Sequence, residues 1–336
     1  MIVGLSPMDG VTDGAFRYMV AKYGHPDVMF TEFVSVDALH YATGERRERL
    51  LKTLMRVGEV ALRVSPLKSD IGTLRERPFK YPYEVAQVFG KTPELFAEAA
   101  ELIGKLGFDG IDINMGCPAA RIEEQGSGAG LIRTPKLAQE IISVVKKATK
   151  LPVSVKTRIG IDQDVAEEWM EALMEVEPAV ISLHGRTLKQ LYQGMADWEA
   201  IGRAGRIVHK YGGYILGNGD IGSVAEGMDK VKQYGVDGFL IGRAAEGNPG
   251  IFLQGSVLCN VCGLQRTDPC KHRRLAWAVE HAKIYEKVLG MGNFMPMRKH
   301  LAWYCRGFPR AVELRMKLMQ CNSSKEVKEL IKPDRD

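Results

Sequence analysis

The segment DGIDINMGCP (109–118) begins as a strand, and the stretch PKLAQEIISVVKKAT (135–149) downstream has helical periodicity. In the first, apolar residues alternate over a short run, whereas in the second they recur every three to four residues. A buried strand followed by an amphipathic helix is one βα unit of a parallel sheet. This segment therefore predicts an α/β fold, and the same unit recurs along the chain.

Eight strand-like runs can be placed in the first 245 residues, most of them followed by a helical stretch. They cover residues 2–8, 27–34, 83–90, 109–115, 152–160, 179–186, 214–221 and 237–245. Eight βα units within about 250 residues fit a (β/α)8 TIM barrel better than an open doubly wound sheet, because no G-x-G-x-x-G fingerprint opens the first βα turn. The run EVALRV (59–64) is expected to be an additional β hairpin or excursion.

The 336 residues are enough for two domains. We expect a barrel over 1–255 and a basic all-helical domain over 256–336, with a Cys-rich linker at 258–274. Residues 256–336 hold 16 Lys and Arg against 8 Asp and Glu, although the net charge of the whole chain is only +5. Such asymmetry is compatible with a polyanionic partner such as nucleic acid, and equally with a solvated surface.

No apolar run is long enough to span a membrane, and the amino terminus lacks the pattern of a signal peptide. The expected location is the cytoplasm, where the six cysteines would remain reduced. A monomer is the default expectation.

The active site of a TIM barrel lies at the carboxyl ends of its strands. Polar residues occur near almost every predicted strand end, and glycines mark the last two loops, GNGDIGS (217–223) and IGRAAEGNPG (241–250). Two consecutive glycine-rich loops at this place are typical of a phosphate site. Lys156 would project into the barrel, where it must face an anion, such as a flavin hydroquinone, or form a Schiff base.

Several of these motifs together resemble the flavin-dependent tRNA dihydrouridine synthases. The resemblance runs in order over roughly residues 2–255 and weakly over 301–318. It rests on SPMDGVTD (6–13), TEFVS (31–35), VFGKTPE (88–94), DINMGCP (112–118), GSGAGLI (126–132), SVKTRIG (154–160), LHGRT (183–187), GNGDI (217–221) and IGRAAEGNPGIF (241–252).

The resemblance implies an enzyme that reduces the C5=C6 bond of specific uridines in tRNA, with FMN bound and NADPH as reductant. Hydride would pass from reduced FMN to C6 of the base. Asn114, Arg158 and Arg186 are expected on the substrate side. The residues expected to bind the cofactor are Pro7, Met8, Gln87, Lys156, His184, Asn218, Gly219, Asp220, Gly242 and Arg243.

Cys117 is the expected general acid, giving its proton to C5. A thiol with an ordinary pKa of about 8.5 is mostly protonated at neutral pH and can act in this way. The alternative is a buried cysteine that only fills space. The glycine-rich stretch 126–130 is expected to be a mobile loop near this residue.

The linker contains Cys259, Cys262, Cys270 and His272, four ligand types that could hold one zinc ion. The single residue between Cys270 and His272 is a tighter spacing than is usual for zinc sites. An irregular linker with reduced cysteines is the alternative.

Two other functions remain open at the level of sequence. One is a flavin barrel that reduces a free pyrimidine, like the dihydroorotate dehydrogenases, for which a basic helical tail has no evident use. The other is an RNA-binding barrel protein without catalysis, in which Cys117 and Lys156 would have no role. The sequence does not indicate which uridine is modified or whether NADPH is preferred over NADH.

Overall fold

The computed structural model describes residues 1–64, 82–253, 257–258, 265–266, 269–290 and 293–331. By their internal contacts they form two compact units. The first unit comprises Met1–Met8, Asp27–Leu54 and Tyr83–Gly242, and the second comprises Asp9–Pro26, Met55–Pro82 and Arg243–Asp336. The chain therefore passes between the units several times, and the domain limits 1–255 and 256–336 remain predictions.

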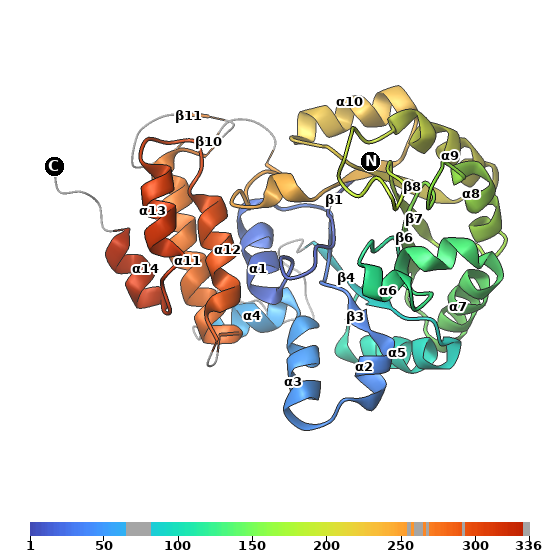
Figure 1. Ribbon diagram of the computed structural model, residues 1–336, viewed down its shortest axis with the longest axis horizontal. Coiled ribbons are helices and arrows are strands. Elements are labelled where there is room, and N and C mark those ends of the chain that lie inside the picture. Colours follow the sequence, from blue (N-terminus) through green and yellow to red (C-terminus); the bar gives the residue numbers. More distant parts are fainter. Residues whose placement is uncertain (65–81, 254–256, 259–264, 267–268, 291–292, 332–336) are drawn as a thin grey trace. The chain divides into compact units, whose positions relative to one another are not determined.

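The first unit is a closed barrel of eight parallel strands, which confirms the predicted (β/α)8 fold (Figure 1). The order around the barrel is β1-β2-β4-β5-β6-β7-β8-β9, and pairing of β9 with β1 and of β2 with β4 closes it. A short additional strand, β3 (Val34–Ser35), pairs with the end of β4. The barrel strands are β1 (Ile2–Leu5), β2 (Val28–Phe30), β4 (Tyr83–Phe89), β5 (Gly110–Met115), β6 (Val153–Arg158), β7 (Val180–His184), β8 (Tyr214–Asn218) and β9 (Gly238–Ile241).

Helices of this unit follow the strands and surround them (Figure 1). Two of the long helices begin with proline at the first turn, where its missing N–H is not needed. The helices are α2 (Val36–Tyr41), α3 (Gly44–Thr53), α5 (Pro93–Leu106), α6 (Ala120–Glu123), α7 (Pro135–Ala148), α8 (Ala166–Met174), α9 (Trp198–Lys210) and α10 (Val224–Tyr234), with the 3-10 turn η1 (Gly128–Arg133).

The second unit is mainly helical and has its own hydrophobic core. Trp277, Tyr285 and Tyr304 are buried in that core. The helices are α1 (Gly14–Tyr23), α4 (Val57–Val64), α11 (Lys271–Val288), α12 (Met295–Tyr304), α13 (Ala311–Leu318) and α14 (Ser324–Leu330), with the 3-10 turn η2 (Arg243–Ala245).

The predicted β run at 59–64 is wrong, because these residues lie in helix α4. Val57, Val60 and Ala61 are buried at helical spacing, and α4 packs against α1 and α11 within the second unit. β-branched residues favour a strand locally, but burial of one helical face overrides that preference.

The expectation that strands end before residue 255 also needs correction. Val257–Leu258 (β10) and Gln265–Arg266 (β11) form a short antiparallel pair within the Cys-rich linker. A two-residue strand is too short to give an alternating pattern in the sequence.

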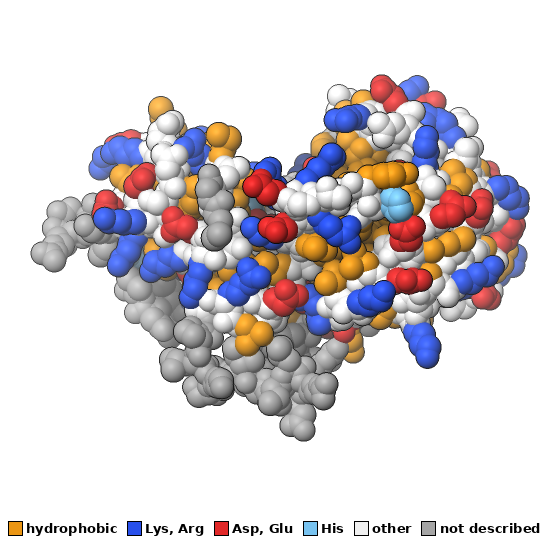
Figure 2. All heavy atoms as spheres, turned by 90° about the horizontal axis from the view of Figure 1, so that it is seen from below, with side chains coloured by type: hydrophobic (Ala, Val, Ile, Leu, Met, Phe, Trp, Pro, Cys, Tyr) orange, Lys and Arg blue, Asp and Glu red, His pale blue; other side chains and the backbone are white. Residues whose placement is uncertain are grey.

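Figure 2 shows that Lys and Arg side chains are interspersed with Asp and Glu on the face drawn, with hydrophobic side chains between them. None of the helices in the described part of the chain combines the length and hydrophobicity needed to traverse a bilayer.

Two histidines are fully buried in the core of the second unit. The rings of His281 and His300 lie 4.7 Å apart between centroids, and the Tyr304 hydroxyl lies 3.2 Å from Nδ1 of His281. Among the described residues, Nε2 of His281 and both ring nitrogens of His300 have no hydrogen-bond partner. Burial lowers the pKa of His281 to about 3 and that of His300 well below its ordinary value, so both are neutral in the folded protein.

We predict that acid destabilises this helical core. In the unfolded chain a histidine binds a proton near pH 6.5, whereas in the folded protein it stays neutral. Below pH 6.5 the unfolded state therefore binds more protons. Each histidine then lowers the free energy of unfolding by up to about 1.4 kcal/mol per pH unit, until the pH reaches the folded pKa. Three carboxyls whose pKa is raised by burial act in the opposite direction as the pH falls: Asp13 and Glu246 in this unit, and Asp112 in the barrel. The contribution of the histidines is therefore measured as the difference between the wild type and a histidine variant.

The test is calorimetric unfolding at pH 7.5 and pH 5. His300→Phe should be neutral or stabilising at pH 7.5, because no hydrogen bond is removed, and it should reduce the loss of stability on acidification. His25→Asn, at an exposed position of the same unit, is the matched control. Equal pH dependence in His300→Phe and the wild type would contradict the assignment.

Candidate active site

Polar side chains from neighbouring strands meet at the carboxyl end of the barrel. In the strand register Asn114 is paired with Lys156, and His184 is paired with both Arg158 and Asn218. Directly paired residues of neighbouring strands point to the same face of a sheet. The structure therefore brings together five of the residues predicted from strand ends.

A chain of hydrogen bonds connects β4 and β5 inside the barrel. The Gln87 amide donates to a carboxylate oxygen of Asp112 (2.7 Å) and accepts from the Asn114 amide (3.0 Å). The Asn114 oxygen in turn accepts from the backbone N–H groups of Gly116 (3.1 Å) and Cys117 (2.9 Å). Asn114 thus fixes the turn that carries the Cys117 thiol.

Asp112 is a fully buried carboxyl that the sequence reading did not select. Burial raises its pKa to about 6, although hydrogen bonds from Ser154 and Gln87 act in the opposite direction. The sequence did contain a signal for it, because an acidic residue in a buried strand needs hydrogen-bond donors from the protein interior. It orients the Gln87 amide, and through it Asn114.

Lys156 projects from β6 and donates to the side-chain oxygen of Asn218 (3.0 Å). Burial lowers its pKa to about 8, and the nearby Arg158 acts in the same direction. Asp112 and Cys117 raise it, but they do not balance the cost of burial. A buried ammonium group in this position is stabilised by a bound anion or an electron-rich ligand edge.

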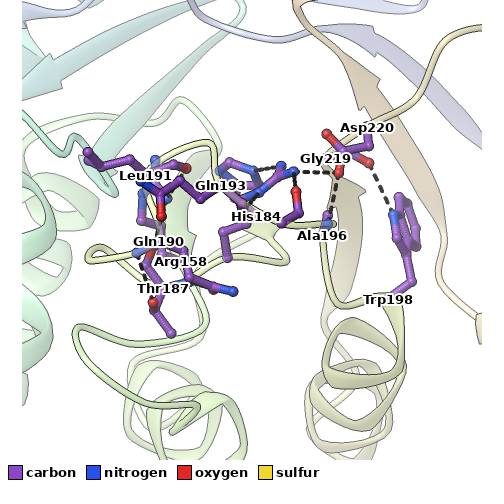
Figure 3. Close-up of polar contacts among 12 residues, drawn as sticks. Arg158, His184, Thr187, Gln190, Leu191, Gln193, Ala196, Trp198, Gly219 and Asp220 are labelled. Atoms are coloured by element: carbon purple, nitrogen blue, oxygen red, sulfur yellow. Dashed lines mark hydrogen bonds and ion pairs between the residues drawn. The ribbon is translucent and has the colours of Figure 1, made fainter.

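Arg158 fastens the Cys117 turn to the loop after β7. Its Nε donates to the carbonyl of Gly116 (2.8 Å), and its Nη1 donates to those of Thr187 (3.0 Å) and Leu191 (3.4 Å). Figure 3 shows the loop residues around this guanidinium. Its role on the substrate side remains a prediction, and the structure shows it binding backbone carbonyls.

Arg186 is the second buried arginine at this rim. Its guanidinium forms an ion pair with Asp220 (2.6 Å) and lies 3.3 Å from Nε2 of His184. A guanidinium only donates, so this geometry favours the His184 tautomer with an unprotonated Nε2. Arg186 also donates to the carbonyls of Gln193 and Gly194.

The glycines of the last two loops are required for different physical reasons. A Cβ on Gly217 would lie 2.3 Å from the Trp198 ring, and Gly219 has φ +129° with Ala196 close by, so packing and backbone conformation require both. Gly242 differs, because its Cβ would meet only Met8 Sδ at 3.6 Å and Ser6 Cβ at 3.7 Å. Arg243 begins η2 directly after β9.

Cys117 is buried and forms no disulfide with any described cysteine. Its carbonyl accepts from the N–H of Ala129 (3.3 Å), and Gly128 lies against its Cβ. The expected mobile loop at 126–130 therefore requires correction, because residues 128–130 begin η1 and are buried against the Cys117 turn.

The candidate zinc site is not defined by the structure. Cys259 and Cys262 lie outside the described residues, and the described histidines, cysteines and acids form no cluster able to hold a metal ion. Cys270 immediately precedes α11, which contains His272.

Among solved structures, the chain is similar to morphinone reductase, with a TM-score of 0.50 and 11% sequence identity. The match covers 74% of this chain and 84% of the other. At this identity the likeness shows the fold alone, and it agrees with the closed (β/α)8 barrel seen here.

The family model described as dihydrouridine synthase (Dus) matches residues 4–334. A Synechocystis sp. protein named "Probable tRNA-dihydrouridine synthase 1" is 34% identical over 329 residues, covering 97% of this chain and 84% of that protein. A Staphylococcus epidermidis protein named "Probable tRNA-dihydrouridine synthase" is 34% identical over 335 residues, covering 97% and 91%. The chain belongs to the dihydrouridine synthase family, which confirms the resemblance noted in the sequence.

We predict that Arg158→Lys lowers the free energy of unfolding by about 2 kcal/mol, because buried carbonyls lose charged donors that a lysine cannot replace together. Urea unfolding measures this change. Arg203→Lys is the matched control, since Arg203 bonds Asp164 and Glu167 at the surface and should change stability by less than about 0.5 kcal/mol. Equal effects of the two variants would contradict the role given to Arg158.

Proposed function

We propose that this protein is a tRNA-dihydrouridine synthase that reduces the C5=C6 bond of specific uridines in tRNA, with FMN as cofactor and NADPH as reductant. The observation that carries the proposal is the hydrogen-bonded path from Gln87 through Asn114 to the Cys117 turn, beside the partly buried Lys156. Family membership supports the reaction and the substrate.

The residues at the barrel mouth are proposed to bind FMN. Burial lowers the pKa of Lys156, and Asp112 and Cys117 offset this only in part, so the ammonium can be stabilised further by the electron-rich edge of a flavin. When bound and reduced by NADPH, FMN would supply the hydride for C6. The proposed cofactor residues are Pro7, Met8, Gln87, Lys156, His184, Asn218, Gly219, Asp220, Gly242 and Arg243.

The protein residues supply orientation and the proton. Asn114, fixed by Gln87, is proposed to hydrogen-bond the uracil, and Cys117 gives its thiol proton to C5 as the double bond is reduced. Arg158 and Arg186 are proposed to lie near the substrate, where their bonds to loop carbonyls keep that side of the site in place.

A uridine in folded tRNA must leave its stack to reach a barrel site, which costs a few kcal/mol. The basic helical region is proposed to offset this cost through phosphate contacts. Some of its cations already have protein partners, as with Arg298 bonded to the Cys321 carbonyl and Arg310 paired with Glu313. Lys283 and Arg315 are therefore better candidates for phosphate contacts than Arg298 and Arg310.

Cytoplasmic location and a monomeric state belong to the same proposal. A zinc ion at Cys259, Cys262, Cys270 and His272 also stays a prediction. Elemental analysis of protein purified without added metal tests it, and one zinc per chain is the expected result.

Cys117→Ala is predicted to lower the rate of dihydrouridine formation by about 10² to 10⁴ fold while NADPH still reduces the flavin, because only the proton donor is lost. Mass spectrometry of tRNA and stopped-flow absorbance measure the two steps. Cys321→Ala, a buried cysteine of the helical unit, is the control. Full turnover by Cys117→Ala would refute the assignment, and reduction of a free pyrimidine instead of tRNA would refute the substrate.

FMN affinity is predicted to fall as the pH rises from 7 to 9.5. Lys156 is charged below its pKa of about 8 and loses its charge above it, so the attraction for the anionic ligand is present at the lower pH. Lys156→Met should bind FMN weakly at every pH and show little of this dependence. Lys210→Met, at an exposed position, is the control, and fluorescence titration is the measurement. A wild-type affinity that is constant over this range would contradict the role of Lys156.

A further inference from the structure

The loop between β7 and α9 exposes three large apolar side chains at the barrel mouth. Leu191 is 44% exposed, Tyr192 60% and Met195 81%. The loop begins at the carboxyl end of β7, directly after His184. Scattered apolar residues are ordinary on a surface, but three within five positions beside an active site form a patch that favours binding.

The backbone of this loop is held in place by hydrogen bonds from buried side chains and from neighbouring backbone. Two almost fully buried arginines, Arg158 and Arg186, donate to carbonyls of this loop. The acceptors are Thr187 and Leu191 for Arg158, and Gln193 and Gly194 for Arg186. The N–H groups of Leu188 and Lys189 donate to the carbonyls of Gly160 (2.9 Å) and Ile161 (3.0 Å). The exposed side chains are thus displayed on a fixed backbone, which reduces the entropy lost on binding.

Leu191 itself has a left-handed backbone conformation, with φ +49°. For a residue other than glycine, asparagine or aspartate this conformation is unfavourable, because Cβ lies too close to the following carbonyl oxygen. The hydrogen bond from Arg158 to its carbonyl helps to maintain it. A strained residue that points an apolar side chain outward indicates a functional constraint rather than a packing need.

The loop is also connected to the thiol. Arg158 bonds the carbonyl of Gly116, next to Cys117, and the carbonyl of Leu191 through the same guanidinium. Tyr192 and Cys117 both raise the pKa of Arg158, although burial lowers it overall, so both groups lie within its electrostatic reach. Arg158 therefore connects the backbone of the apolar patch to the turn that carries Cys117.

We propose that Leu191 and Met195 form a platform for the base of the nucleotide next to the reacting uridine. The inference rests on the proposed function, because it places RNA at this site. The chemistry fits a base rather than a phosphate: the patch is apolar, and the nearby Lys189 is already paired with Asp162 (2.8 Å). A base that loses its stacking partner when the uridine leaves the helix needs such a surface.

The test is steady-state kinetics on tRNA with the double variant Leu191→Ser and Met195→Ser. Loss of a stacking surface should raise KM for tRNA about tenfold, with kcat within about twofold of the wild type. The absorbance of bound FMN, the rate of flavin reduction by NADPH and the thermal midpoint should be unchanged, because these side chains are exposed. Met195→Leu, which retains the apolar surface, should keep the wild-type KM.

Two controls have similar exposure away from the barrel mouth. Met228 on α10 is 40% exposed, and Tyr214, the first residue of β8, is 57% exposed at the amino end of the barrel. Met228→Ser and Tyr214→Ser should leave KM unchanged. If the double variant behaves like these controls, or if it loses FMN, the platform is refuted while the wild-type activity still supports the proposed function. A wild type that forms no dihydrouridine would refute both.

Discussion

Closure of the barrel by the pairing of β2 with β4 is the constraint on which the rest of the first unit depends. β2 is only three residues long, yet it pairs with β1 on one side and β4 on the other. Because all eight strands are parallel, their carboxyl ends must then meet at one rim. Residues far apart in the chain, such as Asn114 and Asn218, reach the same site without any long-range side-chain contact being needed to bring them there.

Closure of the barrel also removes charged side chains from water, which costs free energy. Asp112 and Lys156 are charged groups in a barrel interior, and burial moves the pKa of each toward neutrality. Amide side chains satisfy part of their hydrogen-bonding capacity, through Gln87 for the carboxyl and Asn218 for the ammonium. A polar interior of this kind adds little to the stability of the fold, but it holds Asn114 and the Cys117 turn in one orientation.

The fold was predictable from sequence to the extent that periodicity encodes it. All eight barrel strands were placed correctly, because each buried strand is followed by a segment of different period or by a turn. Segment 59–64 was predicted wrongly, because its β-branched residues, Val60 and Val64, favour a strand locally. Their spacing of four residues suits a helix only when other helices cover that face. Lys156 and Asn218 could be selected from their motifs. The bonds of Arg158 to three carbonyls could not, because they depend on loop backbones whose course no local pattern specifies.

The interleaving of the two units in the chain has a consequence for how the protein can be altered. Helices α1 and α4 come from segments inserted after β1 and β2, yet they share a core with α11, including Ala15, Met19 and Val60. Truncation near residue 255 would remove the helices that pack against these apolar residues and would expose them to water. The helical region is therefore not a detachable module, and variation in it through deletion or domain exchange would have to include two loops of the barrel as well.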